Sequence, residues 1–267
     1  IARKKILLAE DNEINQRLMK SLFLKKGIEI TIVENGELVL KKLKNEHFDI
    51  ILMDCQMPVM DGYEATKAIR TELHMHTIPI VALTANIMLE HKQKALACGM
   101  DDIIGKPFDF DNLLSVLANL LLVGGETNTS TTVETKTEPF NQKKTTTVLV
   151  DFKKGLKTTN NIQDLFIELL TVFIKNYHPN IFSAKVSSQH QMSTLLHELK
   201  SVSASIGAIA LSKRCDHYEQ LNKSEHLSEA HYKELKALLQ TTNAEIKSYI
   251  TYHSDDNNRN KPSSQEV

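Results

Sequence analysis

The sequence predicts an α/β domain with a doubly wound, five-stranded parallel sheet, followed by a second domain made only of helices. In the first half of the chain, short runs rich in Ile, Leu and Val alternate with amphipathic stretches. In the last part, apolar residues recur at helical spacing. A stretch dominated by Gly, Thr, Ser and charge separates the two patterns. A chain of 267 residues is long enough for two domains of ~100–200 residues each.

Five short apolar runs predict strands that are buried on both faces of a sheet. They cover residues 5–9, 29–33, 48–53, 78–83 and 102–104. Helices are predicted over residues 13–26, 35–45, 62–73, 88–97 and 110–121. Strict alternation of strands and helices implies right-handed crossovers, and therefore a parallel sheet with helices on both faces. This first domain is predicted to occupy residues 1–122.

The rest of the chain is predicted to contain a linker, a bundle and a tail. Residues 123–147 have too little apolar surface to offset the entropy of ordering them, so we expect a flexible linker. Residues 148–253 predict an antiparallel four-helix bundle, with apolar periodicity in 162–174, 192–206, 208–221 and 229–250. Pro179 either interrupts the first of these helices or begins a new one. The polar tail, residues 254–267, is expected to be disordered.

The composition bears on the partners and the cellular compartment that we expect for this chain. The net charge of −1 gives no indication of nucleic acid or a membrane surface as partner. Cys55, Cys98 and Cys215 lack metal-ligand spacing and predict reduced thiols in a cytoplasmic protein. No apolar run reaches the ~18 residues of a membrane-spanning helix, and no signal peptide is visible. Because residue 1 is isoleucine, we expect a piece of a longer chain whose upstream part holds a sensor or membrane anchor.

Charged and hydroxyl side chains follow the predicted strands, on the edge where open α/β sheets bind ligands. Glu10 and Asp11 follow the first strand, and Asp54 follows the third. Thr84 follows the fourth strand and Lys106 the fifth. If the strand order is 2-1-3-4-5, the first and third strands are neighbours and the three carboxylates crowd together. Like charges repel unless a cation lies among them, and carboxylate oxygens suit Mg²⁺.

This set of residue types fits phosphoryl transfer, which depends on positioning and charge neutralisation. Asp54 is the predicted nucleophile. Lys106 is expected to pair with Asp54 when the site is empty and with phosphate when it is loaded, and the Thr84 hydroxyl is expected to bond a phosphate oxygen. Taken singly, an acidic residue after a strand is more often a loop residue or a helix cap. The hypothesis depends on all five occurring together.

Four motifs carry a family resemblance: ILLAEDNEIN (6–15), DIILMDCQMPVMDGYEA (49–65), IPIVALTA (78–85) and CGMDDIIGKPFD (98–109). With them, residues 6–122 resemble a response-regulator receiver domain. The resemblance implies that Asp54 is phosphorylated and that Thr84 and Lys106 contact the phosphate. It also implies that Mg²⁺ is bound by Glu10, Asp11, Asp54 and the backbone carbonyl of Gln56. Ile103 stands where many receivers have an aromatic residue, which puts aromatic switch signalling in doubt.

One of the 11 histidines occupies a distinctive helical position. On a helix over 192–206, one face carries the apolar residues Met192, Leu195, Leu196, Leu199, Val202 and Ile206. His197 falls nearly opposite, on the predicted solvent side, together with Lys200, Ser201 and Ala204. Lys200 would neutralise a phosphate on the imidazole, and the small residues would let another protein approach. From this geometry alone, an ordinary surface histidine is an equally good interpretation.

The segment HELKSVSASIGA (197–208) resembles the motif of histidine-phosphotransfer domains. The resemblance implies that His197 receives a phosphoryl group from an aspartate and passes it to another. Ser201 stands where glycine is usual, and because serine is still small we expect transfer to survive at a slower rate. The sequence contains neither a Gly-rich nucleotide loop nor an ATP-binding domain of the histidine-kinase type, so the fragment is predicted to be a phosphotransfer module, and whether to class it as an enzyme stays open.

A receiver followed by a phosphotransfer domain resembles the C-terminal part of hybrid sensor histidine kinases. The expected partners are a histidine kinase core, upstream in the same chain, and a downstream response-regulator receiver. The direction of phosphate flow, and transfer within or between chains, stay open.

Three other functions fit the sequence less well. A receiver-regulated transcription factor needs a basic recognition helix, but residues 208–221 mix Lys213 and Arg214 with Asp216 and Glu219. An aspartyl phosphatase usually has a second aspartate two residues after the first, where Gln56 stands. A flavodoxin-type flavin site would have a Ser/Thr/Gly phosphate loop after the first strand, and EDNEIN stands there.

Overall fold

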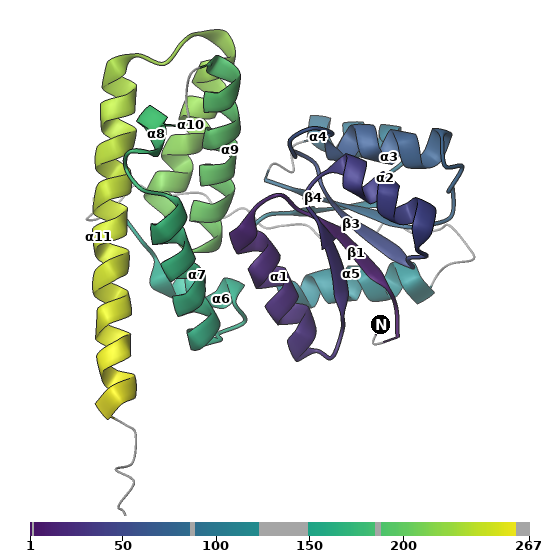
Figure 1. Ribbon diagram of the computed structural model, residues 1–267, viewed down its shortest axis with the longest axis horizontal. Coiled ribbons are helices and arrows are strands. Elements are labelled where there is room, and N and C mark those ends of the chain that lie inside the picture. The colour runs from purple at the N-terminus through teal and green to yellow at the C-terminus, as the bar shows by residue number, and fades with distance from the viewer. Residues whose placement is uncertain (2, 86–88, 123–148, 185–187, 260–267) are drawn as a thin grey trace, which may run out of the picture.

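The structure is a computed structural model that describes residues 1, 3–85, 89–122, 149–184 and 188–259. It has two regions, an α/β region and a helical region, which lie side by side (Figure 1). The predicted linker, residues 123–147, lies outside the described residues. No helix within the described ranges combines the length and apolar character needed to cross a membrane.

The sheet of the α/β region is parallel and has the predicted order, β2-β1-β3-β4-β5. Its strands are β1 (Ile6–Ala9), β2 (Ile30–Val33), β3 (Ile50–Asp54), β4 (Ile80–Thr84) and β5 (Asp102–Gly105). The strands differ from the prediction in two respects. Asp54 and Thr84 are the last residues of their strands instead of the first residues after them. Only β1, β3 and β4 are buried throughout, because the edge strands β2 and β5 have a neighbour on one side alone.

Helices cover both faces of the sheet, as predicted (Figure 1). They are α1 (Glu13–Lys25), α2 (Gly36–Asn45), α3 (Gly62–Thr71), α4 (Leu89–Cys98) and α5 (Phe110–Leu122). Alternate strand residues contribute to two cores: Ile6 and Leu8 pack with α1 and α5, whereas Leu7 and Ala9 pack with α2, α3 and α4. Burial on both faces explains why the central strands are continuous apolar runs in the sequence.

Two helices that begin next to the strand ends of the candidate site have side chains that cap their first turns. The Asn12 side chain caps α1 by accepting hydrogen bonds from the backbone of Ile14 and Asn15. Asp61 and Glu64 form a capping box at the start of α3. Gly62 is required there by close packing, since a Cβ atom at this position would lie 2.1 Å from the backbone oxygen of Asp54.

The second region is helical, as predicted. Its helices are α6 (Phe152–Thr158), α7 (Gln163–Asn176), α8 (Ile181–Ala184), α9 (Gln189–Ser205), α10 (Ile209–Ser224) and α11 (Glu229–Arg259). The four long helices pack alongside one another (Figure 1), and the short α6 and α8 were not predicted. Pro179 lies between α7 and α8 and so belongs to neither helix. The tail prediction is wrong for residues 254–259, because α11 continues to Arg259; residues 260–267 lie outside the described residues.

Helix α1 lies between the sheet and the helical region, where it packs against α7 and α9 (Figure 1). Buried side chains on both sides of this contact belong to one continuous apolar cluster. Two polar contacts flank it. Arg17 Nη1 lies 2.8 Å from Glu168 Oε1, and Asn176 Nδ2 donates to Glu13 Oε2 at 3.0 Å. The contact therefore places α9 beside the edge of the sheet at which α1 begins.

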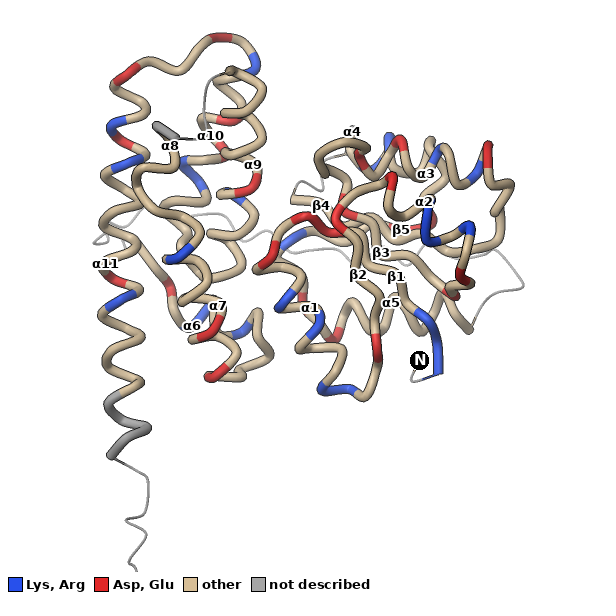
Figure 2. Tube along the Cα trace, in the orientation of Figure 1, with Lys and Arg blue, Asp and Glu red and all other residues tan. Residues whose placement is uncertain are grey.

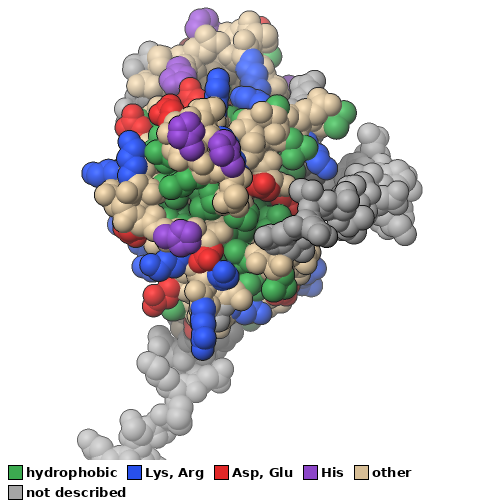
Figure 3. Space-filling model, turned by 90° about the vertical axis from the view of Figure 1, so that its right-hand side faces the viewer, with side chains coloured by type: hydrophobic (Ala, Val, Ile, Leu, Met, Phe, Trp, Pro, Cys, Tyr) green, Lys and Arg blue, Asp and Glu red, His purple; other side chains and the backbone are tan. Residues whose placement is uncertain are grey.

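The surface that faces away from the helical region carries a mixture of charged and apolar side chains. Among its described residues, basic and acidic side chains are interspersed with histidines and apolar side chains (Figure 3). This face of the α/β region thus presents both signs of charge close together.

Candidate functional site

Three carboxylates meet at the ends of β1 and β3. Glu10, Asp11 and Asp54 each place one oxygen within 4.8 Å of the others' oxygens. They converge because β1 and β3 are hydrogen-bonded neighbours, with Ala9 opposite Met53. Glu10 and Asp54 are buried, with 1% and 5% of their surface exposed. Acidic positions gather at this edge of the sheet, next to α9 (Figure 2).

Lys106 supplies positive charge to this pocket. Its Nζ lies 2.5 Å from both Glu10 Oε2 and Asp54 Oδ2. Burial alone would lower the pKa of Lys106, but the Asp54 and Glu10 carboxylates outweigh that effect and raise it. The ammonium group is therefore charged, and it pairs with Asp54.

The pocket holds three carboxyl groups and, among the described residues, one ammonium group. Burial, followed by the Glu10 and Asp54 carboxylates, raises the pKa of Asp11 from 3.8 to about 7. Burial also raises the pKa of Glu10, against the opposing effect of Lys106 and of Asn15, whose Nδ2 donates to Glu10 Oε1 at 2.9 Å. Buried carboxylate oxygens with an unfavourable surplus of like charge are the donor set that a hard divalent cation fits.

The remaining predicted residues of this region lie at the same edge. Thr84 ends β4, is buried, and accepts the Lys106 backbone N–H on its carbonyl oxygen at 2.6 Å. Gln56 is exposed, and its backbone N–H donates to Asp54 Oδ1 at 3.2 Å. Ile103 is partly buried against the core beneath α2, α3 and α4. The strand ends thus bring the predicted acceptor, lysine and threonine together.

His197 differs from its prediction as a solvent-facing imidazole. Its side chain on α9 is only 17% exposed, and Nδ1 lies 3.0 Å from Glu219 Oε1 on α10. Lys200 is also buried, and its Nζ bonds Glu219 Oε2 at 2.6 Å and Asp216 Oδ1 at 3.1 Å. The helical pattern located the apolar face of α9 correctly, but it did not show that α10 covers part of the polar face.

Glu219 is the residue at this site that the sequence did not indicate. Burial would raise its pKa, but hydrogen bonds and charge from His197 and Lys200 lower it to about 2. The carboxylate is therefore ionised at neutral pH. Gly207, with φ +81°, lies in the tight turn between α9 and α10, which folds α10 back onto α9. That glycine was the available signal that an α10 side chain would reach His197.

Small residues on α9 also lie in a more crowded place than predicted. Ser201 is buried, and its Oγ has no hydrogen-bond partner among the described residues. One turn further along, Ser205 Oγ lies 3.5 Å from Asn15 Oδ1 of α1. The face of α9 that was expected to be open to another protein is partly covered by α1 of the same chain.

A buried polar network joins the two regions, and none of its members was predicted. Tyr177 donates its hydroxyl to Glu198 Oε1 at 2.5 Å, and Asn12 Nδ2 donates to the Tyr177 hydroxyl at 2.8 Å and to Glu198 Oε1 at 3.2 Å. Burial and the Glu198 carboxylate raise the pKa of Tyr177. Glu198 also contributes to the raised pKa of Asp11. The residue after His197 therefore reaches the acidic pocket.

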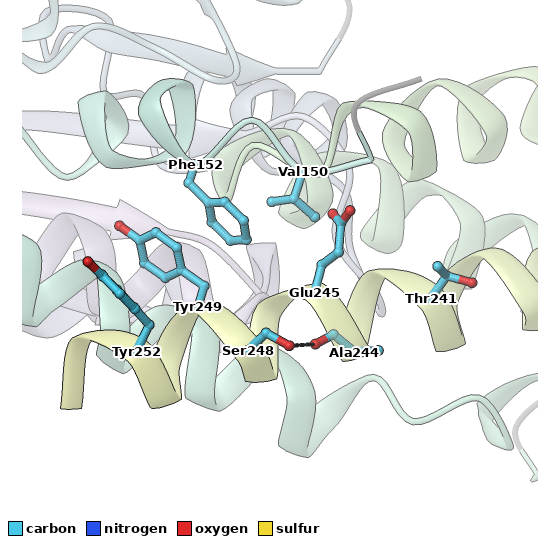
Figure 4. A pocket seen from close by; sticks show the side chains of 8 residues that line it. All are labelled: Val150, Phe152, Thr241, Ala244, Glu245, Ser248, Tyr249 and Tyr252. Atoms are coloured by element: carbon cyan, nitrogen blue, oxygen red, sulfur yellow. Dashed lines mark hydrogen bonds between the residues drawn. The ribbon is translucent and has the colours of Figure 1, made fainter. Parts of the chain in front are cut away.

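A hollow of about 520 Å³ lies elsewhere, between the start of α6 and α11 (Figure 4). It is lined by Val150, Phe152, Thr241, Ala244, Glu245, Ser248, Tyr249 and Tyr252. Phe152 and Tyr249 stack there with ring centroids 4.0 Å apart. No predicted site residue lines this hollow. The candidate site consists instead of the acidic pocket at the strand ends and of His197 with Lys200 on α9.

Comparison with known proteins agrees with the geometry. Residues 6–118 match the response regulator receiver domain family. Sensor protein GacS of Pseudomonas syringae pv. syringae is 30% identical over 235 residues, 85% of this chain and 26% of GacS. Hybrid signal transduction histidine kinase A of Dictyostelium discoideum is 43% identical over 120 residues, 43% of this chain and 6% of that kinase. The chain thus spans about a quarter or less of these relatives.

A solved receiver domain is also similar. It belongs to the sensor histidine kinase PA1611 of Pseudomonas aeruginosa PAO1 and has a magnesium ion coordinated in its active site cleft. It is 36% identical, with 44% of this chain and 97% of that domain covered and a TM-score of 0.42. By their match to the family, residues 6–118 of the present chain form a response regulator receiver domain, and hybrid histidine kinases are among the chain's relatives.

Proposed function

We propose that this chain passes a phosphoryl group between Asp54 and His197 in a phosphorelay, as the C-terminal segment of a hybrid sensor histidine kinase. The observation that carries the proposal is the docking of the helical region, with His197 on α9, beside the edge of the sheet that holds the pocket of Asp54. The similarity to GacS supports it, because 235 aligned residues extend beyond the receiver domain into the helical region. In this proposal the helical region is a histidine-phosphotransfer domain.

The acidic pocket is proposed to bind Mg²⁺ through Glu10, Asp11, Asp54 and the backbone carbonyl of Gln56. The clustering of three carboxylates, with Lys106 as their cationic neighbour, fits that ion. When bound, Mg²⁺ would supply positive charge that offsets the carboxylates and the phosphoryl oxygens.

Asp54 acts as the nucleophile in one direction. A carboxylate oxygen attacks phosphorus, the bond from phosphorus to the imidazole nitrogen breaks, and its electron pair returns to the ring. Lys106 already lies at hydrogen-bond distance from Asp54 and exchanges this contact for a phosphoryl oxygen. The Thr84 hydroxyl, at the neighbouring strand end, donates to a second oxygen.

His197 acts as the nucleophile in the opposite direction. Because Glu219 is ionised, its oxygens only accept hydrogen bonds, so the proton between Glu219 and Nδ1 is on the ring. In its neutral form the imidazole has its lone pair on Nε2, which attacks phosphorus while the bond from phosphorus to the Asp54 oxygen breaks and its electron pair returns to the carboxylate. Lys200, held near Glu219, neutralises the phosphoryl group formed on the ring. Glu219 is thus a positioning residue for His197.

The partners follow from this role. A histidine kinase core in the same parent protein would supply the phosphoryl group to Asp54, and a receiver of a downstream regulator would take it from His197. We place both reactions in the cytoplasm.

The test is to phosphorylate the chain with acetyl phosphate and Mg²⁺, and to map the label. Aspartyl phosphate is lost in base, whereas phosphohistidine survives base and is lost in acid. We expect label on both residues in wild type, on Asp54 alone in His197→Ala, and on neither in Asp54→Ala. Exposed matched controls, His190→Ala on α9 and Asp111→Ala on α5, should label normally. Label on His197 without Asp54, or no Mg²⁺-dependent label in folded protein, would contradict the proposal.

A further inference from the structure

The contact between the two regions contains a charged group that its apolar packing does not require. Glu198 Oε1 accepts hydrogen bonds from Tyr177 of its own region and from Asn12 of the receiver domain. Asn12 is buried and follows Asp11 directly. Docking therefore places a carboxylate of the helical region one residue away from the acidic pocket.

The charges near Glu198 make this arrangement sensitive to a cation. The pocket already contains the carboxylates of Glu10, Asp11 and Asp54. Its one ammonium neighbour among the described residues, Lys106, pairs with Glu10 and Asp54. Glu198 thus adds a carboxylate beside a site in which carboxyl groups already outnumber the ammonium group, and like charges at short range in a partly buried site repel. A divalent cation in the pocket reverses the sign of that interaction.

We propose that Glu198 links cation binding in the acidic pocket to docking of the helical region on the receiver domain. A bound cation strengthens docking, and docking strengthens cation binding by the same factor, because the linkage of two equilibria is reciprocal. The inference rests on the Mg²⁺ site of the proposed function. It adds that the loaded receiver holds the helix carrying His197 more tightly than the empty receiver does.

The chain offers a matched control in the same interface. Glu168 on α7 pairs with Arg17 of α1, and the side chains of both are nearly half exposed. Arg17 also bonds Glu13, whose side chain is half exposed, so these charges are in contact with solvent. Glu168→Gln removes the same charge as Glu198→Gln from the same interface. It removes that charge from a pair outside the Asn12, Tyr177 and Glu198 network.

The experiment measures Mg²⁺ affinity by titration calorimetry, and compactness by small-angle X-ray scattering, on the whole chain at constant ionic strength. Glutamine at position 198 keeps the oxygen that accepts from Tyr177 and Asn12, so Glu198→Gln removes charge with little change in shape. We expect it to weaken Mg²⁺ binding on the order of fivefold or more, a typical coupling between two sites. We also expect Mg²⁺ to make the wild-type chain more compact. Glu168→Gln should loosen docking, but Mg²⁺ should still make this variant more compact.

Two results would overturn the linkage. One is equal Mg²⁺ affinity for wild type and Glu198→Gln, and the other is a wild-type chain that expands when Mg²⁺ is added. With either result, the labelling of Asp54 and His197 would be unaffected, so the proposed function would stand. A wild-type chain that binds no Mg²⁺ would instead overturn the metal site and the linkage together.

Discussion

The Nδ1 atom of His197 lies 3.0 Å from Oε1 of Glu219, whose other oxygen bonds Lys200. One carboxylate on α10 therefore holds both the proposed phosphoacceptor and the cation proposed to stabilise its phosphorylated form. This arrangement differs from a freely exposed histidine, because the ring orientation and the position of its proton are set before a phosphoryl donor arrives.

Replacement of Glu219 by glutamine should slow transfer to His197 by roughly 10- to 100-fold. A hydrogen bond to a charged group contributes about 1.5–3 kcal/mol, and each 1.4 kcal/mol corresponds to a tenfold change in rate. Rapid-quench measurement of phosphohistidine formation checks this. Asp216→Asn is the control, since Asp216 also bonds Lys200 but is more than half exposed. Equal rates for the two variants would show that Glu219 does not position the ring.

Replacement of Lys106 by methionine should prevent stable phosphorylation of Asp54 and lower the melting temperature in the absence of Mg²⁺. The variant leaves the buried carboxylates of Glu10 and Asp54 without their cation, and removal of one member of a buried pair typically costs about 3–5 kcal/mol. Mg²⁺ should restore much of the lost stability, because it supplies charge at the same place. Thermal unfolding with and without Mg²⁺ measures this. Equal destabilisation under both conditions would contradict a shared site.

Mg²⁺ affinity should rise by about tenfold between pH 6 and pH 8. A cation binds the ionised form of Asp11, whose pKa is raised to about 7, so protons compete with the cation below that pH. The stability of the metal-free fold changes with pH in the opposite direction. A carboxyl whose pKa is raised on folding stabilises the fold when protonated, so this contribution in the metal-free protein is lost as pH rises from about 4 through 7. Calorimetric titration at both pH values is the measurement, and Asp11→Asn should abolish most of the pH effect.

Gly62→Ala should destabilise the receiver domain by about 1–3 kcal/mol and disturb phosphorylation of Asp54. The added Cβ would lie 2.1 Å from the Asp54 backbone oxygen, so β3 or α3 must move. Gly27→Ala serves as the comparison, because a Cβ there meets nothing within 4 Å, although its φ of +69° makes alanine mildly strained. Chemical unfolding should show a lower free energy of unfolding for Gly62→Ala, and labelling of Asp54 should be reduced in the same variant. Gly27→Ala should be slightly less stable than wild type but should label normally.

The receiver site was largely predictable because each of its signals is local. Apolar runs located the strands, and the parallel order then placed Asp54 beside Glu10 and Asp11 without any knowledge of side-chain contacts. Lys106 and Thr84 were predicted to lie near Asp54 by the same rule, because the carboxyl ends of parallel strands meet at one edge of the sheet.

The helical region was less predictable because its site depends on contacts between helices. Periodicity identified the buried face around Leu199, but no periodicity shows which α10 residue faces His197. The contacts of Asn12 with Tyr177 and Glu198 bridge more than 160 residues of sequence, and no local pattern encodes them. The short helices α6 and α8 have too few turns to show a periodic pattern.

The most direct test of the account is a ³¹P NMR time course on the whole chain after addition of acetyl phosphate and Mg²⁺. We expect an acyl phosphate resonance first, and a phosphoimidazole resonance, substituted at Nε2 of His197, growing after it. Both should be absent from Asp54→Ala, and the second alone should be absent from His197→Ala. A phosphoimidazole resonance in Asp54→Ala, or its failure to appear in wild type while the acyl phosphate persists, would contradict transfer from Asp54 to His197.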